Sequence, residues 1–378
     1  MILVLADDLS GAAELAGIAA KHGRSAEVHS AYHPGSPADV IAVDTRSRSL
    51  SPDRAGERIT LFFEQYQSQH PRWVFKKTDS ALRGNIACEL QSLAAATGNS
   101  RILFVPANPS KARTIIRGEY RIDNSPISQT VFSRDPHHPI RSSRIIDLFP
   151  TDYSLPVYSI RATETSPTTG LIIPDIKTEQ EVHLRASELN RETLAAGAAD
   201  FFQACLLANP EPGTPPKPIP DRQRLNGKRL LICGSLAAWD QGIAQEASLR
   251  DIPVLPLQSA ESWIKQAQVK FDHHDAILIA AGRPEDLERG HSSQLTPDQI
   301  LDQLIITATA VIQSHQPSEI FTEGGATSVA LFDAMGWTRF HVVPAELPGV
   351  GCLSPHGEAR PTRLFVKPGS YPWPRGSW

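Results

Sequence analysis

The stretch Lys76-Lys-Thr-Asp-Ser-Ala-Leu-Arg-Gly-Asn85 gives the clearest indication of how this chain folds. It follows Arg72-Trp-Val-Phe75, an aromatic and β-branched run that predicts a buried strand. It precedes residues 86–96, where apolar side chains recur at helical spacing. Ser80 or Asp79 is predicted to cap this helix, and Gly98 to end it. The stretch is therefore predicted to be a turn between the end of a strand and the start of a helix.

The side chains of this turn suit the binding of an anion. Open α/β sheets bind anions at such turns, because unpaired backbone N–H groups and the helix dipole point outward there. Lys77 and Arg83 are candidates to clamp a carboxylate or phosphate, and Asp79 is a candidate to accept a proton or a hydroxyl hydrogen bond. The competing interpretation is a solvated turn that only caps a helix.

Composition indicates an ordinary globular chain. It has 378 residues, of which 40% are hydrophobic and 21% charged, which predicts two or three domains with sizeable cores. The net charge is −4 without a basic tail, so nothing suggests a nucleic-acid partner. The apolar start, Met1 to Ala6, lacks a basic region and is too short for a signal peptide or membrane span. The four cysteines show no paired spacing, so we expect reduced thiols and a cytoplasmic protein with no membrane partner.

Strands and helices are predicted to alternate through the first half of the chain. The expected strands are residues 2–5, 25–29, 40–43, 72–75 and 101–105. The expected helices are residues 12–21, 53–67, 86–96 and 179–202. Residues 114–127 are expected to form a hairpin or flap. Alternation of this kind predicts a parallel sheet whose strands end at one edge. Three polar clusters follow strands at that edge: Asp7/Asp8, Asp44/Arg46 and Lys77 to Arg83. Asp44 could equally cap a turn, and Arg48 and Arg83 could be structural ion-pair partners.

A proline-rich segment divides the chain. Six prolines fall between positions 210 and 220, which excludes this segment from a sheet interior or a helix. We therefore predict a linker at 210–226 between domains at 1–209 and 227–378. The second domain is predicted to hold strands at 229–233, 252–257, 276–280 and 319–322, and helices at 260–268, 296–313 and up to Met335. Gly234-Ser235 and Glu323-Gly-Gly-Ala-Thr327 are strand-to-helix turns suited to backbone contacts with phosphates, and 348–351 and 367–370 are predicted loops.

Several common site motifs are missing from the sequence. There is no Walker A pattern, and Gly349-Val-Gly351 lacks the third glycine of a dinucleotide site. Asp272-His-His-Asp275 precedes a strand and reads better as a surface turn than as a metal site. These observations exclude the standard P-loop kinases and argue against a Rossmann dinucleotide site.

The chain resembles the four-carbon acid sugar kinase family, whose members phosphorylate threonate, erythronate and oxo-tetronates. The resemblance spans nearly the whole chain and rests on Ala6-Asp-Asp-Leu-Ser-Gly-Ala12, Asp44-Thr-Arg-Ser-Arg48, Lys76 to Asn85, Pro106-Ala-Asn-Pro109, Phe132-Ser-Arg-Asp-Pro136, Gly234-Ser235, 323–327, 346–350 and 367–370. The block at Lys76 is the most specific, and it differs from the family pattern by Ala81 alone. Ala326 departs from the pattern, because the family has an acidic residue there.

The resemblance implies two α/β domains, each an open, mostly parallel sheet flanked by helices, with the active site in the cleft between them. It implies that the first domain binds the sugar acid and the second binds ATP, with Mg²⁺ as the accompanying ion, and it makes a homodimer plausible. The residues implied for substrate are Asp8, Arg46, Lys77, Thr78, Asp79 and Ser80, to which we add Arg83; those implied for nucleotide are Ser235, Gly324, Gly325, Ala326, Thr327 and Gly369.

Phosphoryl transfer needs positioning and charge neutralisation more than covalent chemistry. We hypothesise that Arg46, Lys77 and a helix N-terminus at Ser80 hold the substrate. Asp79 is the first candidate to orient or deprotonate the attacking hydroxyl, and Asp8 the second. No motif names the metal ligands; Glu323 and Glu346 are the candidates. Two alternatives stay open: a sugar-acid-binding protein that has lost ATP-dependent activity, and a kinase of another small hydroxy acid.

Overall fold

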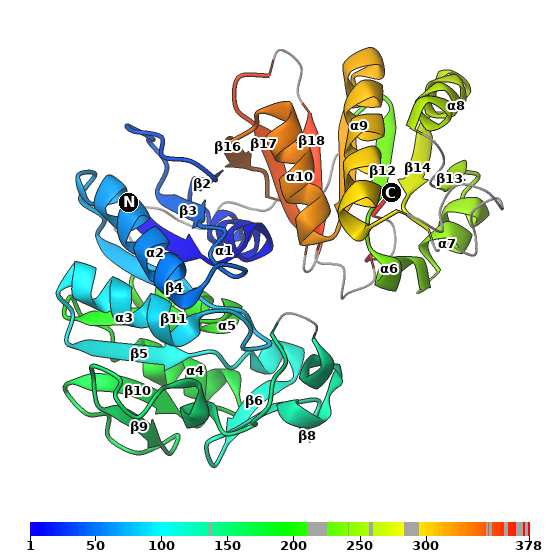
Figure 1. The fold of residues 1–378 in the computed structure, drawn as a ribbon. Coiled ribbons are helices and arrows are strands. Elements are labelled where there is room, and N and C mark those ends of the chain that lie inside the picture. Colours follow the sequence, from blue (N-terminus) through cyan, green and yellow to red (C-terminus); the bar gives the residue numbers. More distant parts are fainter. Residues whose placement is uncertain are drawn as a thin grey trace. The chain divides into compact units, whose positions relative to one another are not determined.

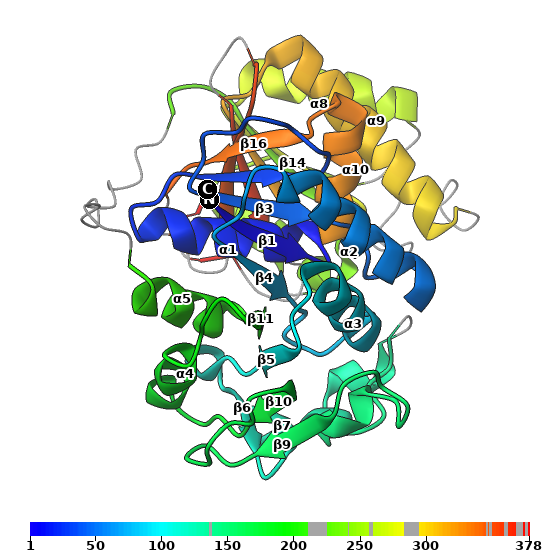
Figure 2. The ribbon, with the colours of Figure 1, turned by 90° about the vertical axis from the view of Figure 1, so that its left-hand side faces the viewer.

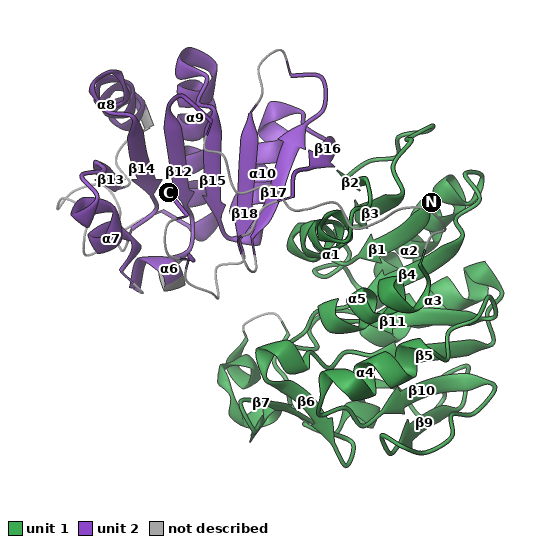
Figure 3. Ribbon diagram, turned by 180° about the vertical axis from the view of Figure 1, so that it is seen from behind, with its two compact units in different colours: residues 1–217 green, residues 218–378 purple. Residues whose placement is uncertain are grey.

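We analysed a computed structural model of the chain. It describes residues 1–135, 138–210, 225–240, 242–256, 260–282, 295–344, 347, 350–358, 362–367, 373–374 and 377–378, apart from the side chains of 236, 237 and 260. The chain divides into two compact units, residues 1–217 and 218–378 (Figure 3). Most of the predicted linker, residues 211–224, lies outside the described residues, so its form stays a prediction.

The described part of the first unit is built on a parallel sheet with the strand order β2-β3-β1-β4-β11-β5-β10-β9 (Figure 1). The strands are β1 (Ile2–Ala6), β2 (Ala26–His29), β3 (Val40–Asp44), β4 (Trp73–Lys77), β5 (Arg101–Val105), β9 (Val157–Ile160), β10 (Gly170–Pro174) and β11 (Thr193–Gly197). Every residue of β1, β3, β5, β10 and β11 is buried. This burial explains their continuous apolar sequences, because helices cover both faces of a parallel sheet.

Helices cover both faces of this sheet. They are α1 (Leu9–Lys21), α2 (Pro52–Gln67), α3 (Ile86–Thr97), α4 (Glu179–Ala186) and α5 (Ala199–Ala208). In Figure 2, α2 and α3 lie on one face, and α1, α4 and α5 lie on the other. The predicted alternation of strands and helices around a parallel sheet is confirmed.

Two local predictions in this unit are wrong. Residues 179–202 are not one helix: α4 ends at Ala186, and Thr193–Gly197 form strand β11, which pairs with β4 and β5. Alanine favours helices, but here burial between two strands overrides propensity. Helix α3 begins at Ile86, so neither Ser80 nor Asp79 caps it; Asn85 is the cap residue, and its side chain makes no capping hydrogen bond. Gly98 ends α3 in a left-handed conformation, as predicted.

The predicted hairpin is present as a small antiparallel sheet. Its strands are β6 (Arg113–Ile116), β7 (Glu119–Ile122) and β8 (Ser125–Pro126), followed by the 3₁₀ helix η3 (Val131–Arg134). Asp123 and Asn124 form a turn with positive φ angles of 49° and 65°, which these residue types tolerate. We call residues 113–135 the flap.

The described part of the second unit has a mixed sheet with the order β13-β14-β12-β15-β18-β17-β16. Its strands are β12 (Arg229–Cys233), β13 (Val254–Pro256), β14 (Ala276–Ala280), β15 (Glu319–Glu323), β16 (Arg339–Val342), β17 (Gly351–Pro355) and β18 (Arg363–Lys367). Strands β13, β14, β12, β15 and β18 are parallel to one another, and β17 is antiparallel to both of its neighbours, β18 and β16. The prediction of two mostly parallel α/β sheets is therefore confirmed.

Helices of the second unit are α6 (Leu236–Asp240), α7 (Ile243–Leu249), α8 (Ala260–His273), α9 (Pro297–His315) and α10 (Gly325–Met335). Helices α8, α9 and α10 pack side by side (Figure 1). Side chains of α6 and α7 and the C-terminal Trp378 pack with Leu231, Phe321 and Phe365 of the sheet. In the described part of the chain, no helix combines the length and the apolar character that crossing a membrane requires.

Candidate functional site

The three predicted polar clusters meet at one edge of the first sheet. Strand β1 lies between β3 and β4, and Ala6 is level with both Asp44 and Lys77 at the ends of those strands. Residues that follow the three strands therefore emerge side by side. Helix α1, which follows β1, and helix α2, which follows the neighbouring β3, lie on opposite faces of the sheet (Figure 2). This edge is therefore a topological switch point, where open α/β sheets bind ligands.

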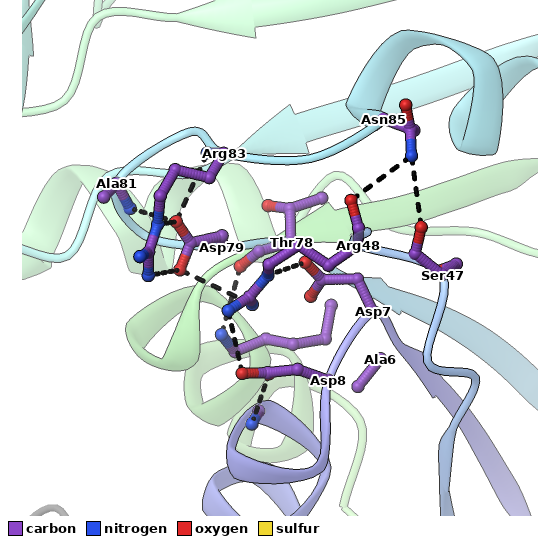
Figure 4. Close-up of polar contacts among 12 residues, drawn as sticks. Ala6, Asp7, Asp8, Ser47, Arg48, Thr78, Asp79, Ala81, Arg83 and Asn85 are labelled. Carbon is purple, nitrogen blue, oxygen red and sulfur yellow. Dashed lines mark hydrogen bonds and ion pairs between the residues drawn. The ribbon is translucent and has the colours of Figure 1, made fainter. Parts of the chain in front are cut away.

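Arg48 joins the clusters through its guanidinium group (Figure 4). Its Nε lies 2.7 Å from Oδ2 of Asp7, its Nη1 lies 2.9 Å from Oδ2 of Asp8, and its Nη2 lies 3.5 Å from Oδ1 of Asp79. The three carboxylates come from two different strand ends, and Arg48 comes from the third. One guanidinium thus offsets the mutual repulsion of three carboxylates, which its forked geometry allows.

Asp79 is almost completely committed to interactions inside the protein. Its Oδ2 accepts hydrogen bonds from the backbone N–H groups of Ala81 and Arg83, both at 3.2 Å, and from Arg83 Nε at 2.7 Å. Its Oδ1 accepts from Arg83 Nη2 at 3.2 Å. Burial favours the neutral acid, but Arg48 and Arg83 outweigh it and hold the pKa of Asp79 well below its ordinary value. Asp79 is therefore a firmly ionised carboxylate that orders the turn.

Asp8 has a different environment. Its Oδ1 accepts a hydrogen bond from Gly11 N at 2.8 Å and so caps helix α1, while 27% of its side chain remains exposed. Burial, together with the charges of Asp7 and Asp79, raises the pKa of Asp8 above its ordinary value, although Arg48 and Lys77 oppose the shift. Two carboxylates held by one arginine thus differ in their readiness to take a proton.

Arg46 and Asp44 form the third cluster. Arg46 has a positive φ of 52°, and its backbone N–H donates to Asp44 Oδ1 at 3.1 Å. Its Nε lies 3.5 Å from Asp44 Oδ2, with 33% of the Arg46 side chain exposed and 1% of the Asp44 side chain. Burial and the nearby charge of Asp8 raise the pKa of Asp44 to about 7. Near neutral pH this carboxyl is partly protonated, so it neutralises the charge of Arg46 incompletely.

The lysines of the turn have separate partners. Lys76 is fully buried, and its Nζ lies 3.0 Å from Oε2 of the buried Glu89 on α3. Lys77 Nζ donates to the carbonyl of Thr78 at 3.0 Å and lies 3.5 Å from Oε2 of Glu14 on α1. The other oxygen of Glu14 is 2.6 Å from Lys111 Nζ, so Glu14 joins two lysines. Lys76 therefore anchors the sheet to α3, and Lys77 faces the start of α1.

The flap contacts the turn at Ser80 and Arg83. Arg113 Nη1 donates to Ser80 Oγ, and Tyr120 OH donates to the Ser80 carbonyl at 2.8 Å. Arg83 Nη1 lies 3.3 Å from Asp135 Oδ2. The Phe132 ring lies 5.6 Å from the Arg83 guanidinium and 5.9 Å from that of Arg113, distances at which cation–π attraction operates. The predicted flap thus belongs to this site.

Thr78 and Asn85 complete the turn. The hydroxyl of Thr78 is buried and has no hydrogen-bond partner among the residues that the structure describes. Asn85 Nδ2 donates to the carbonyls of Ser47 at 3.1 Å and Leu50 at 2.9 Å. Asn85 therefore holds the loop that carries Arg48, which explains why its side chain does not cap α3.

In the second unit, two of the predicted nucleotide turns lie against each other. A Cβ on Gly234 would lie 2.1 Å from Thr327 Oγ1, so only glycine fits there without movement. Gly324 has a φ of 101° and is the cap residue of α10, which Gly325 begins; Ala326 is exposed and Thr327 is buried. Ser235 Oγ accepts from the Ala238 N–H at 3.2 Å. Gly369 and Glu346 lie outside the described residues.

Two family models match successive parts of this chain. A family model described as a sugar-binding N-terminal domain matches residues 2–202, and one described as a nucleotide-binding C-terminal domain matches residues 245–371. The first match alone covers more than half of the chain. This chain belongs to the four-carbon acid sugar kinase family.

Two curated members of the family show the range of the likeness. The D-threonate kinase of Salmonella typhimurium is 26% identical over 93% of this chain and 90% of its own length. The D-erythronate kinase of Heliobacterium modesticaldum is 24% identical over 92% of this chain and 88% of its own length. A crystal structure of a Salmonella typhimurium LT2 protein matches with a TM-score of 0.79 at 17% identity, over 98% of this chain and 96% of that one.

Several residues of the site in this kinase-family chain were missed from sequence or given only a structural role. They are Glu14, Arg48, Glu89 and Lys111. Arg48 could have been found, because it follows the same strand end as Asp44 and Arg46. Glu14 and Glu89 could not have been found, because each lies on a helix and contacts its lysine only when that helix packs against the sheet.

Proposed function

We propose that this protein is a kinase that transfers a phosphoryl group from ATP to a hydroxyl of a four-carbon sugar acid. The observation that carries the proposal is the Arg48 assembly at the switch point of the unit that matches the sugar-binding model. Relatives of this chain named D-threonate, D-erythronate and 3-oxo-tetronate kinase support the substrate class. The proposed acceptor is accordingly threonate, erythronate or an oxo-tetronate.

Cations and hydroxyls at the strand ends would hold the acid. Arg46 is one-third exposed beside a carboxyl that is partly protonated at neutral pH, which suits a bidentate contact with the substrate carboxylate. Arg83 is 28% exposed and offers a second guanidinium. Lys77, Ser80 and the Thr78 hydroxyl would contact the hydroxyl groups of the acid, and Thr78 has hydrogen-bonding capacity to spare among the described residues.

The proton acceptor in this proposal is Asp8. A general base works best when its pKa approaches the operating pH and when it can reach the substrate. Asp8 has a raised pKa and an exposed edge, whereas the pKa of Asp79 is lowered and both of its oxygens are occupied. Asp79, the first candidate from sequence, would instead bind substrate and position Arg83 and Arg48.

Nucleotide would bind the second unit at Ser235 and at Gly324, Gly325, Ala326 and Thr327. Gly369, which the resemblance adds, lies outside the described residues. The 11-residue helix α10 presents its N-terminus there, and free N–H groups at a helix start favour phosphates. Among the described residues no group of three or more His, Cys, Asp or Glu side chains is arranged to hold a metal. Mg²⁺ commonly uses one or two carboxylates and the phosphates of its nucleotide. The ion would neutralise charge that develops on the transferred phosphoryl group.

The test is ADP release with Mg·ATP and a panel of D- and L-threonate, D- and L-erythronate, and their 2- and 3-oxo forms. The expected result is turnover of one member, with kcat lowered about 10²- to 10⁴-fold in Asp8→Asn. Binding of an acid without binding of ATP, both measured by calorimetry, would replace the proposal with a sugar-acid-binding protein. ATP binding without turnover of any member would point to another small hydroxy acid.

A further inference from the structure

Three polar or reactive side chains form a row across the second sheet, at the ends of the strands that lead into the proposed nucleotide turns. Cys233, Glu323 and Lys367 are the last residues of β12, β15 and β18, and the register pairs Glu323 with both of the others. Because side chains alternate along strands, the three share a face with the residues two positions earlier, Leu231, Phe321 and Phe365. The row is therefore bordered by apolar side chains on the sheet.

Glu323 and Lys367 form a buried ion pair in this row. Lys367 Nζ lies 2.5 Å from Glu323 Oε1, and each side chain is only 2% exposed. Burying a charged pair is costly, and apolar residues of similar size often serve stability better. Burial raises the pKa of Glu323 to about 7, against the effect of Lys367, and lowers the pKa of Lys367. Loss of solvent therefore disfavours the charged forms of both residues. This cost fits a role of the pair other than stabilising the fold.

The position of the pair adjoins the turns that the phosphates would occupy. Glu323 immediately precedes Gly324, whose backbone N–H donates to the Lys367 carbonyl at 3.0 Å. The adjacent turns at Ser235 and Thr327 follow the same strand ends. Lys367 Nζ also lies 5.4 Å from the centre of the Trp373 ring.

We propose that Lys367 binds the β- and γ-phosphates of the nucleotide, and that Glu323 is the counter-ion that holds the lysine until phosphate replaces it. The proposal rests on the nucleotide site of the proposed function. A lysine ammonium is a compact charge that binds phosphate well, and its three donors can exchange a carboxylate for phosphate oxygens. The exchange would move the ammonium relative to Trp373, which makes the indole a reporter.

Calorimetry with ATP, ADP, AMP and inorganic triphosphate tests this assignment in wild type, Lys367→Met and Glu323→Gln, each with Mg²⁺. Lys367→Met should weaken ATP and triphosphate by about tenfold to a hundredfold, the worth of a charge-assisted hydrogen bond. AMP, which lacks those phosphates, should change by less than about threefold. Glu323→Gln should bind ATP at least as tightly as wild type, because it removes the competitor of phosphate. Lys265→Met, an exposed lysine of α8, is the matched control and should bind as wild type does.

A lone buried Glu323 could destabilise Lys367→Met, so the same comparison is made in the Glu323→Gln background, where no unpaired charge remains. Tryptophan emission should shift when wild type binds ATP, and the shift should be absent in Trp373→Phe and in Lys367→Met. Equal weakening of ATP and AMP in either background, or ATP binding within about twofold of the parent, would overturn the assignment. These binding measurements do not require turnover. If wild type binds ATP but phosphorylates none of the acids, the proposed function is contradicted, whereas the role of Lys367 is still decided by the ATP affinity of Lys367→Met.

Discussion

Asp8 and Arg48 lie end to end, with Oδ2 of the carboxylate 2.9 Å from Nη1 of the guanidinium. The same guanidinium contacts Asp7 and Asp79, so Asp8 shares its cation with two other carboxylates. This sharing explains how Asp8 can remain near an arginine and still have a raised pKa. It also divides two roles between two aspartates that the sequence alone does not distinguish.

Replacing Asp8 and replacing Asp79 should have different kinetic effects. Asp8→Asn should lower kcat by about 10²- to 10⁴-fold, the usual contribution of general base catalysis, because it removes the proton acceptor. Asp79→Asn should act mainly on substrate KM and on stability, because it frees Arg83 and the backbone N–H groups that it holds. Steady-state kinetics of both variants check this. A greater loss of kcat in Asp79→Asn, with Asp8→Asn within about tenfold of wild type, would return the base role to Asp79.

Arg48→Met should destabilise the first unit and abolish turnover. It leaves three carboxylates close together without their shared cation, and removal of one partner from a buried charge network costs on the order of 3 kcal/mol. Arg48→Lys should recover only part of this loss, because one ammonium cannot reach three carboxylates as a fork does.

Urea unfolding measures the effect of Arg48, and Arg54→Met is its control. Arg54 is exposed on α2, so its loss should change the free energy of unfolding by no more than about 0.5 kcal/mol. Equal stability of Arg48→Met and Arg54→Met would show that the carboxylates do not need Arg48.

Asp44→Asn should change how stability depends on pH. The pKa of Asp44 rises from 3.8 to about 7 in the folded chain, so between these pH values the folded state holds a proton that the unfolded state has lost. The contribution of Asp44 to stability is therefore fully present below about pH 4 and is lost as the pH rises to 7. The free energy of unfolding of Asp44→Asn relative to wild type should accordingly rise across this window by on the order of 4 kcal/mol.

Unfolding by urea at several pH values between 4.5 and 8 checks the Asp44 prediction. Asp53→Asn, on the exposed surface of α2, is the matched control and should follow wild type at every pH. A constant difference between Asp44→Asn and wild type over the whole range would contradict a shifted titration of Asp44.

Gly197→Ala and Gly17→Ala should have opposite effects on stability. A Cβ on Gly197, at the end of β11, would lie 2.0 Å from the Val105 carbonyl oxygen, so the backbone must move at a cost of on the order of 3 kcal/mol. Gly17, within α1, has open space around its Cβ position, and alanine there should stabilise by about 0.5–1 kcal/mol. Thermal unfolding measures both. Stabilisation by Gly197→Ala would instead support the helix that the sequence predicts across 179–202.

Much of the fold follows from local patterns. Short apolar runs that end in polar turns identified β1, β3, β4, β5, β12, β14 and β15, and the rule that parallel strands end at one edge placed Asp8, Arg46 and Lys77 together. The hairpin at Asp123-Asn124 was predictable because residues that tolerate positive φ reveal turns directly.

Strand β11 was not predictable in this way. Thr193-Leu-Ala-Ala-Gly197 has helical composition, and it is a strand because the gap between β4 and β5 can be filled only by extended backbone. The start of α3 was misplaced for a related reason: Asp79 and Ser80 look like caps, but their side chains bind Arg83 and Arg113.

The sequence by itself determined the α/β architecture, the family and the edge of the sheet where the site lies, because these depend on residue patterns within single segments. Only the tertiary structure decided that Arg48 serves three carboxylates, that Asp8 and Asp79 have opposite pKa shifts, and that Glu323 is held by Lys367. Charges act through space, and their effect depends on burial and on neighbours that lie far away in the chain. Such effects have no signature in the order of residues.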